Sequence, residues 1–395
     1  MSTDSLQASL HAHLAHWGLR LFSSDADYFA WQRAMLSAAD LNQLATMVER
    51  KRGGARHDEI AFYDLTASPR ILPVLYSQRY EYFIEIGCRV LPRIGAATTV
   101  LDYGCGVGIL TTFYARQYPE RQFVGVDRSP GSIAVAQAMA HELRLSNVRF
   151  ECHDVEADAL HGSYDLIIAT HALVQAEQDP GIPSRDWTTF ERAHDEQQQA
   201  AFEQRTGIGV RLDRLGAVLH SGGHMMIFEK TRQLARRVPF QRALARRGLQ
   251  LVENPEPVRY RLVEEIADDG PFYVVQKGSS LPLAWNETPE PDEAPSFDRL
   301  MLQSVPHDPQ DPDIPLYENH WPSAQRAWES LADRRVQQEE TRQEADGRQL
   351  HVELGSAEGL VYLYCANMFD QRQLILVEGS RKGMLDSYYR EILSS

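Results

Sequence analysis

The segment that most constrains the fold of this chain is VLDYGCGVG, at residues 100–108. An aliphatic run ends in Asp102 and leads directly into Gly104, Gly106 and Gly108, and residues 109–117 then have helical character. Glycines let the backbone turn tightly and approach a ligand without a Cβ, while the start of a helix presents unpaired N–H groups. The segment therefore predicts a strand, a ligand-binding turn and a helix within an α/β fold.

The sequence around this segment repeats the same alternation. Short aliphatic or β-branched runs are separated by helical stretches, which is typical of a parallel sheet with crossover helices. The expected strands, seven in number, cover residues 99–102, 122–127, 148–153, 165–169, 224–229, 249–253 and 272–277. Before them, Leu10, Leu14, Trp17 and Leu21 recur at helical spacing.

Composition changes divide the chain of 395 residues into four parts. We expect a helical lid region at 1–95, a ligand-binding domain at 96–278 with an insertion at 176–210, a linker rich in proline and acids at 279–315, and a small α+β unit at 316–395. In the last part we predict a helix at 321–342, strands at 351–354, 360–366 and 373–377, and a closing helix at 384–393.

Charge and cysteine content narrow the class of partner. Forty basic and 55 acidic side chains give a formal charge of -15, which disfavours nucleic acid as a partner. The four cysteines lack CxxC spacing, so a reducing compartment is expected. With neither an export signal nor an apolar run of about 20 residues, the chain is predicted to be soluble and cytoplasmic, with no membrane contact.

Acidic residues at three predicted strand ends indicate which ligand the glycine turn binds. The turn reads GxGxG rather than GxGxxG, and Asp102 would repel a pyrophosphate but could hold the ammonium of a methionine moiety. Asp127 follows Gly108 by nineteen residues and is placed to accept bonds from ribose hydroxyls. Asp154 could accept a bond from an adenine amino group, while Val155 offers its backbone N–H.

Together these segments resemble the class I S-adenosylmethionine-dependent methyltransferases over residues 70–277. The elements LDYGCGVG, VGVD, CHDVE, YDLIIATHALVQ and LDRLGAVLHSGGHMMIFEK stand in the family's order, although Ser221 replaces a common proline. The resemblance implies a seven-stranded Rossmann-like sheet of order 3-2-1-4-5-7-6, with the seventh strand antiparallel, and S-adenosyl-L-methionine as cofactor. The residues expected to bind it are Asp102, Gly104, Cys105, Gly106, Gly108, Asp127, Arg128, His153, Asp154, Val155 and Thr170.

His171 is the predicted catalytic residue, because it follows the fourth strand at the edge where cofactor and acceptor would meet. A methyl group on a sulfonium is already activated, so a base is optional, and a near-neutral histidine could take a proton from an oxygen or amine acceptor. The alternative is that His171 packs on the adenosine or caps the next helix. His153 is expected near adenine rather than as a base.

Other polar clusters carry weaker hypotheses. Tyr63, Tyr76 and Arg79 could close over cofactor or acceptor, but aromatics before the first strand are at least as often core. No metal site is expected, since the spacing of His11, His13 and His16 spreads them around a helix. Alternating aromatics in the C-terminal unit predict either a homodimer or a cover for the acceptor site.

The function that these features favour is methyl transfer to an oxygen or nitrogen of a small molecule, such as a biosynthetic or natural-product intermediate. The Asn-Pro-Pro-Tyr type of element found in many nucleic-acid amino methyltransferases is absent, with Ala169, Thr170 and His171 in its place. Two alternatives remain open: methylation of a protein or peptide, and a non-catalytic scaffold that binds the cofactor.

Overall fold

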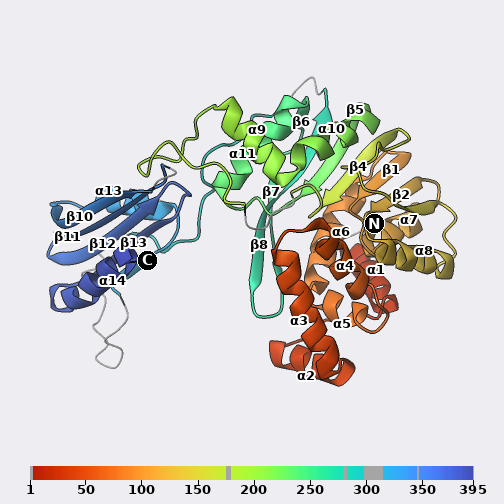
Figure 1. The fold of residues 1–395 in the computed structure, drawn as a ribbon, viewed down its shortest axis with the longest axis horizontal. Helices are drawn as coiled ribbons and strands as arrows, with labels where there is room; N and C mark the ends of the chain where they lie inside the picture. The colour runs from red at the N-terminus through yellow and green to blue at the C-terminus, as the bar shows by residue number, and fades with distance from the viewer. Residues whose placement is uncertain (1–2, 175–178, 279–282, 298–314, 345–346, 395) are drawn as a thin grey trace. The chain divides into compact units, whose positions relative to one another are not determined.

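The computed structural model describes residues 3–174, 179–278, 283–297, 315–344 and 347–394. The chain forms two compact units, between which it passes several times. The first contains residues 1–179, 203–232 and 241–285, and the second contains residues 180–202, 233–240 and 286–395. We call them the N-terminal and the C-terminal unit and describe each by itself (Figure 1).

A mixed sheet organises the N-terminal unit. Its strands follow the order β3-β2-β1-β4-β5-β8-β6, with β7 paired to β8 off this path. β1, β2, β3, β4 and β5 are mutually parallel, whereas β8 runs antiparallel to β5. The strands are β1 (Thr99–Tyr103), β2 (Gln122–Asp127), β3 (Val148–Cys152), β4 (Tyr164–Thr170), β5 (Leu219–Phe228), β6 (Leu249–Leu251), β7 (Glu256–Arg261) and β8 (Ile266–Lys277).

This topology confirms the predicted fold class, with one strand more than expected. β7 was not predicted: it forms a hairpin with the first half of β8, and the two lie side by side in Figure 1. The long β8 occupies the place of the expected antiparallel seventh strand. Because parallel strands end at the same edge of a sheet, the residues after β1, β2, β3 and β4 are brought together.

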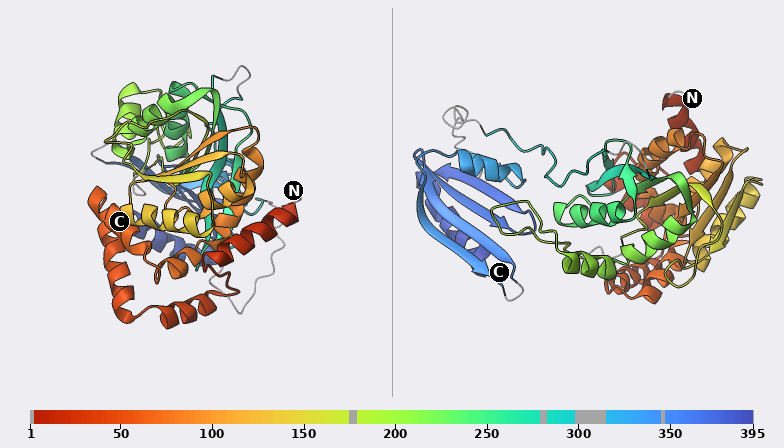
Figure 2. Two further views of the ribbon diagram at one scale, coloured as in Figure 1. Left: turned by 90° about the vertical axis from the view of Figure 1, so that its right-hand side faces the viewer. Right: turned by 90° about the horizontal axis from the view of Figure 1, so that it is seen from above.

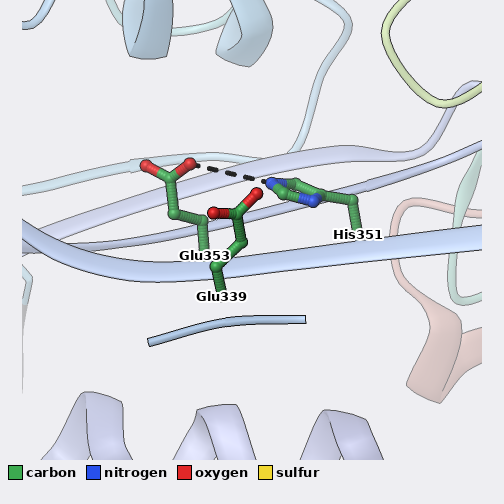
Figure 3. A group of neighbouring side chains, drawn as sticks. All are labelled: Glu339, His351 and Glu353. Carbon is green, nitrogen blue, oxygen red and sulfur yellow. Dashed lines mark ion pairs between the residues drawn. The ribbon is translucent and has the colours of Figure 1, made fainter. Parts of the chain in front are cut away.

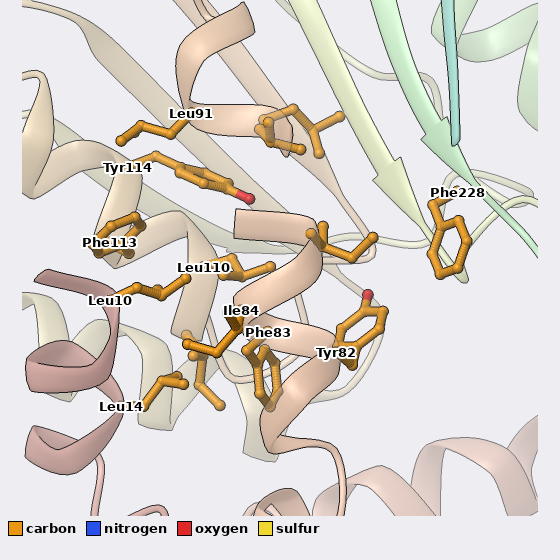
Figure 4. Close-up of a cluster of buried hydrophobic side chains, with 14 of the residues drawn as sticks. Leu10, Leu14, Tyr82, Phe83, Ile84, Leu91, Leu110, Phe113, Tyr114 and Phe228 are labelled. Carbon is orange, nitrogen blue, oxygen red and sulfur yellow. The ribbon is translucent and has the colours of Figure 1, made fainter. Parts of the chain in front are cut away.

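Helices of the N-terminal unit cover the sheet and supply most of its core. Figure 4 shows Leu10 and Leu14 packed near Phe83, Ile84 and other labelled apolar side chains. The helices before the sheet are α1 (Thr3–His16), α2 (Asp25–Met35), α3 (Ala38–Arg52), α4 (Arg56–Thr66), α5 (Leu72–Ser77) and α6 (Tyr80–Arg93). Those after β1 are α7 (Ile109–Gln117), α8 (Pro130–Glu142) and α10 (Ile208–Val218). Two more helices, α9 (Glu196–Thr206) and α11 (Leu234–Arg246), each contain residues of both units.

The C-terminal unit is built on a second, antiparallel sheet of order β10-β11-β12-β13-β9. Alternate residues of its strands face two apolar layers. One layer includes Ala324 and Ala327 of α13, and the other includes Leu385 and Tyr389 of α14; Figure 2 shows both helices against the blue sheet. The elements are β9 (Tyr317–Asn319), α13 (Ser323–Ser330), β10 (Arg335–Gln343), β11 (Gln349–Ala357), β12 (Leu360–Asn367), β13 (Arg372–Glu378) and α14 (Lys382–Ser394).

The helix predicted at 321–342 is wrong in its second half. It ends at Ser330, and Arg335–Gln343 is strand β10, paired with β11 along its length. The residues of β10 are polar and exposed, so their pattern resembled a solvated helix. Pairing with a neighbouring strand outweighs such weak local propensity.

The predicted insertion at 176–210 also differs from expectation. Residues 180–202 belong to the C-terminal unit and only those from Glu203 onward to the N-terminal one, while 175–178 lie outside the described residues. Within the C-terminal unit, the amide of Ser184 donates to the carbonyl of Met368 at 2.8 Å, and Arg192 pairs with Asp370. Residues 180–202 are thus held in place by residues much later in the sequence, Met368 and Asp370.

The structure describes residues 283–297 and 315 of the predicted linker at 279–315. Residues 279–282 and 298–314 lie outside the described residues, and 283–297 contain no helix or longer strand. Across the described ranges, no helix is both long enough and apolar enough to pass through a membrane.

Candidate functional site

The glycine turn after β1 depends on residues without a Cβ. Gly104, Gly106 and Gly108 have φ values of 73°, 54° and 80°, which lie in the left-handed region. A Cβ on Gly104 would approach the Cβ of Ala172 to 2.4 Å, whereas one on Gly106 would meet nothing within 4 Å. The turn therefore packs against the end of β4 on one side and leaves the backbone of Gly106 accessible to a ligand.

Asp102 lies at the end of β1 and is almost fully buried. The hydroxyl of Thr111 on α7 donates to its carboxylate. Burial raises the pKa of Asp102 to about 7, although this hydrogen bond works in the opposite direction. A cationic group brought to Asp102 would favour its ionised form, which fits the ammonium that the sequence predicts there.

Asp127 lies at the end of β2 and stabilises the glycine turn through hydrogen bonds. Its two carboxylate oxygens accept from the backbone N–H groups of Gly106 and Ser129, each at 2.9 Å. Burial raises its pKa, against the effect of these two bonds. Each oxygen keeps a further lone pair, which the ribose contact predicted from the sequence would use.

The residues after β3 lie beside the same turn and are covered by α4. The amide of His153 donates to the carbonyl of Asp127 at 2.9 Å, and Val155 is buried. Asp154 accepts from the amide of Glu156 at 3.0 Å and forms an ion pair with Arg56 of α4. The Asp154 carboxylate therefore already has partners, so its predicted adenine contact would have to be shared.

Two further residues of the predicted cofactor set are held by neighbours. Arg128 forms an ion pair with Glu59, which also lies on α4. Desolvation raises the pKa of the Cys105 thiol well above its usual value. Asp64 of the same helix accepts from the hydroxyl of Ser129 at 2.7 Å. Helix α4 thus closes the side of the site at which Asp127 and Asp154 lie.

A second polar cluster surrounds His171, directly after β4. Arg79 at the start of α6 approaches Nδ1 of His171 to 2.7 Å, and Asp269 of β8 approaches Nε2 to 3.2 Å. The ring of Tyr82 stacks on the imidazole at 5.2 Å, and the hydroxyl of Tyr260 donates to Asp269. We call Arg79, Tyr82, His171, Tyr260 and Asp269 the His171 cluster.

The contacts of His171 fix its protonation state. A guanidinium can only donate, so Nδ1 must accept from Arg79, and the ring proton resides on Nε2, toward Asp269. Burial lowers the pKa of His171 to about 4 despite the opposing effect of Asp269. Burial would raise the pKa of Asp269, but His171 and Tyr260 hold it well below its usual range. At neutral pH the cluster holds a neutral imidazole between a cation and an anion.

Two neighbours connect this cluster to the glycine turn. Thr170, the last residue of β4, lowers the pKa of the Tyr82 hydroxyl against the larger, opposite effect of burial. Glu229, after β5, accepts from the backbone N–H groups of Ala172 and Leu173 at 2.7 and 2.6 Å, which fixes the segment that packs on Gly104. The cofactor and acceptor sides of the predicted site therefore lie next to each other.

Some members of this site were not predicted. Tyr82, Tyr260 and Asp269 contact it from a helix and strands that carry no motif. Glu229 lies in the element LDRLGAVLHSGGHMMIFEK, but no role was assigned to it from the sequence. Arg79 was considered only for the lid. The one available signal was the pair of acids in the short sequence ADDG between β-rich runs, which does not reveal its partner.

The comparisons with known proteins agree with this geometry. Residues 94–269 match the model of a family described as "Methyltransferase domain". That range contains the glycine turn, the strand-end acids and strands β1 to β7. The chain contains a class I S-adenosylmethionine-dependent methyltransferase domain. The cationic methyl donor of this class fits the residues present, since buried Asp102 and half-buried Asp127 flank an accessible glycine backbone.

Individual relatives match the chain over limited lengths. The chain is 39% identical over 70 residues to malonyl-[acyl-carrier protein] O-methyltransferase of Acetivibrio thermocellus, covering 18% of this chain and 24% of that protein. It is 30% identical over 164 residues to release factor glutamine methyltransferase of Escherichia coli, covering 40% of this chain and 57% of that protein. The matches thus span about a quarter and little more than half of these relatives.

Solved methyltransferases are also similar to the chain. The N-methyltransferase NodS of Bradyrhizobium japonicum, solved with S-adenosyl-L-homocysteine, covers 49% of this chain with 85% of its own length, at 16% identity and a TM-score of 0.33.

Proposed function

We propose that this protein transfers a methyl group from S-adenosylmethionine to a carboxylate oxygen of a small acid. The observation that carries this choice of acceptor is Arg79. It touches the imidazole of His171 and the ring of Tyr82, and among the described residues no carboxylate lies within ion-pair distance of it. A largely enclosed guanidinium without an anionic partner is suited to bind an anionic substrate.

Carboxylate acceptors also suit the protonation state of the cluster. A carboxylate is ionised at neutral pH, so it needs no base, and a histidine with a pKa of about 4 is a weak one. S-adenosylmethionine supplies an electrophilic methyl, so that an O–C bond forms as the C–S bond breaks and neutral S-adenosylhomocysteine is left. The role of this chain is to hold the acceptor oxygen in line and to exclude water.

In this proposal His171 is a positioning residue rather than the general base that the sequence suggests. Its Nδ1 orients the Arg79 guanidinium, and its Nε2–H faces Asp269. To act as a base, Nδ1 would first have to release Arg79. The malonyl group named for the relative from Acetivibrio thermocellus carries a free carboxylate, which supports the same acceptor class.

The first test addresses the cofactor. Calorimetry of the full chain with S-adenosylmethionine and with S-adenosylhomocysteine should show one binding event for each. Asp127→Ala should weaken both by at least about tenfold, because two supports of the glycine turn and the ribose contact are lost. If neither compound binds, the proposal fails at its first premise.

The second test addresses the acceptor. A panel of small mono- and dicarboxylic acids and of matched amines is incubated with the cofactor, and base-labile methyl esters are counted. Arg79→Gln should raise KM for the acids at least about tenfold, with cofactor affinity unchanged. Arg89→Gln, on the same helix but paired with Glu85, is the matched control. Methylation of amines or of release-factor peptides, but of no acid, would overturn the carboxylate assignment.

A further inference from the structure

A group of potential metal ligands lies in the C-terminal unit, apart from the residues assigned to methyl transfer. Glu339 is on β10, and His351 and Glu353 are on β11. Glu339 is the register partner of Glu353, so the two carboxylates lie on the same face of neighbouring strands. One ligand atom of each of the three residues lies within 4.8 Å of the others, and Figure 3 shows the side chains converging.

The position of His351 points to a cation. Its side chain is 1% exposed, and within the described part of the chain its Nε2 makes no hydrogen bond. Nδ1 lies 2.9 Å from the hydroxyl of Thr341, to which it can donate. In that tautomer the bare lone pair of Nε2 faces two carboxylates, an arrangement that is repulsive unless a cation or a proton lies between them.

Neighbouring side chains orient both buried ligands. The Trp187 ring stacks on the imidazole at 3.7 Å with an interplanar angle of 2°. Oε1 of Glu353 accepts from the Tyr362 hydroxyl and from Nε1 of Trp328, the latter at 3.2 Å, so its other oxygen is left facing His351. Outer contacts that fix the ring plane and the free carboxylate oxygen in this way are typical of metal sites.

The distance between His351 and Glu353 distinguishes a bound metal ion from a bound proton. Nε2 of His351 is 3.7 Å from Oε2 of Glu353, which is long for the hydrogen bond of a protonated imidazole. Bonds of about 2.0–2.2 Å to a tetrahedral Zn²⁺ place a nitrogen and an oxygen about 3.4 Å apart, close to the observed spacing. Glu339 is exposed, so an ion could reach the group from solvent.

We propose that Glu339, His351 and Glu353 bind one divalent transition-metal ion of the zinc class, with water completing the coordination. One imidazole and two carboxylates form a ligand set that such ions accept, and three protein ligands leave a position open. The hydrogen bonds from Tyr362 and Trp328 occupy one oxygen of Glu353, so its other oxygen is available as a ligand beside His351 and Glu339.

The test is a titration of the full chain with ZnCl₂ and MnCl₂ after removal of metals by a chelator. Calorimetry should show one saturable site per chain, and tryptophan fluorescence should change in parallel, because Trp187 and Trp328 contact two of the ligands. Glu339→Gln lies on an exposed strand, so it should weaken binding at least about tenfold with the melting temperature of the metal-free chain unchanged.

The matched control is Glu340→Gln, the next residue on β10, whose register partner is Val352 on the opposite face of the sheet. It should bind the ion as the wild type does, whereas His351→Gln should abolish the fluorescence change. The proposal is overturned if no saturable binding occurs, or if Glu339→Gln and Glu340→Gln bind equally. It is also overturned if fluorescence changes with pH and is insensitive to added metal, since a proton then occupies the group.

Discussion

Two buried carboxyl groups of the methyltransferase domain both have a raised pKa, but they accept hydrogen bonds from different kinds of donor. Burial raises the pKa of both Asp102 and Glu229 to about 7. Glu229 accepts from backbone N–H groups after β4, whereas Asp102 accepts only from the Thr111 hydroxyl among the described residues. Glu229 is thus part of the scaffold, while Asp102 still has capacity for a cationic ligand.

Replacing Asp102 by asparagine should therefore change stability and binding in opposite directions. A carboxyl whose pKa is raised in the folded state favours folding at low pH, and this contribution is lost as pH rises from about 4 to about 7. Relative to the wild type, Asp102→Asn should gain up to a few kcal/mol of unfolding free energy above pH 7. Urea denaturation of the cofactor-free chain at pH 5 and 8 measures this difference.

The same variant should bind S-adenosylmethionine at least about tenfold more weakly at pH 8, because a neutral amide replaces the anion beside the ammonium. The wild type should also lose affinity as pH falls below 7, and the variant should not. An equal pH dependence in both proteins would show that Asp102 does not titrate on binding.

At the scale of elements, the turn between β1 and α7 is sterically determined. Gly104→Ala places a Cβ at a φ of 73° and against the Cβ of Ala172. We expect a loss of about 2–4 kcal/mol of unfolding free energy together with loss of cofactor binding. Gly216→Ala, in the interior of α10 with open space around it, should instead stabilise by about 0.5–1 kcal/mol. Thermal melts of both variants would show whether the loss of stability is specific to Gly104 or follows from any replacement of glycine by alanine.

The elements around the cofactor could be predicted from sequence because their signals are local. β2 has the predicted bounds, and the turn after β1 combines a strand, glycines and a helix within a short stretch. The His171 cluster could not be predicted, because Arg79, Tyr260 and Asp269 meet only after the sheet and the β7–β8 hairpin form. Glu339 and His351 likewise become neighbours only once β10, which resembled a helix, pairs with β11.

At the scale of the whole molecule, the C-terminal unit is assembled from three separate stretches of chain. Truncation after Trp285 would leave residues 180–202 and 233–240 without their partners, such as Met368, Asp370 and Glu290. We expect the truncated chain to aggregate or to melt well below the full chain, because buried Arg192 and Arg237 lose their ion pairs. A calorimetric transition identical to that of the full chain would contradict this.

The stacking of Trp187 on His351 also bears on how the protein is made. The tryptophan leaves the ribosome well before the β11 strand that carries its partner, by on the order of ten seconds at common elongation rates. During that interval an aromatic side chain and the arginines of the same segments are exposed in the nascent chain. Conditions that slow translation beyond residue 286 should therefore increase chaperone association and proteolysis within residues 180–202, while the sheet of the N-terminal unit is already complete.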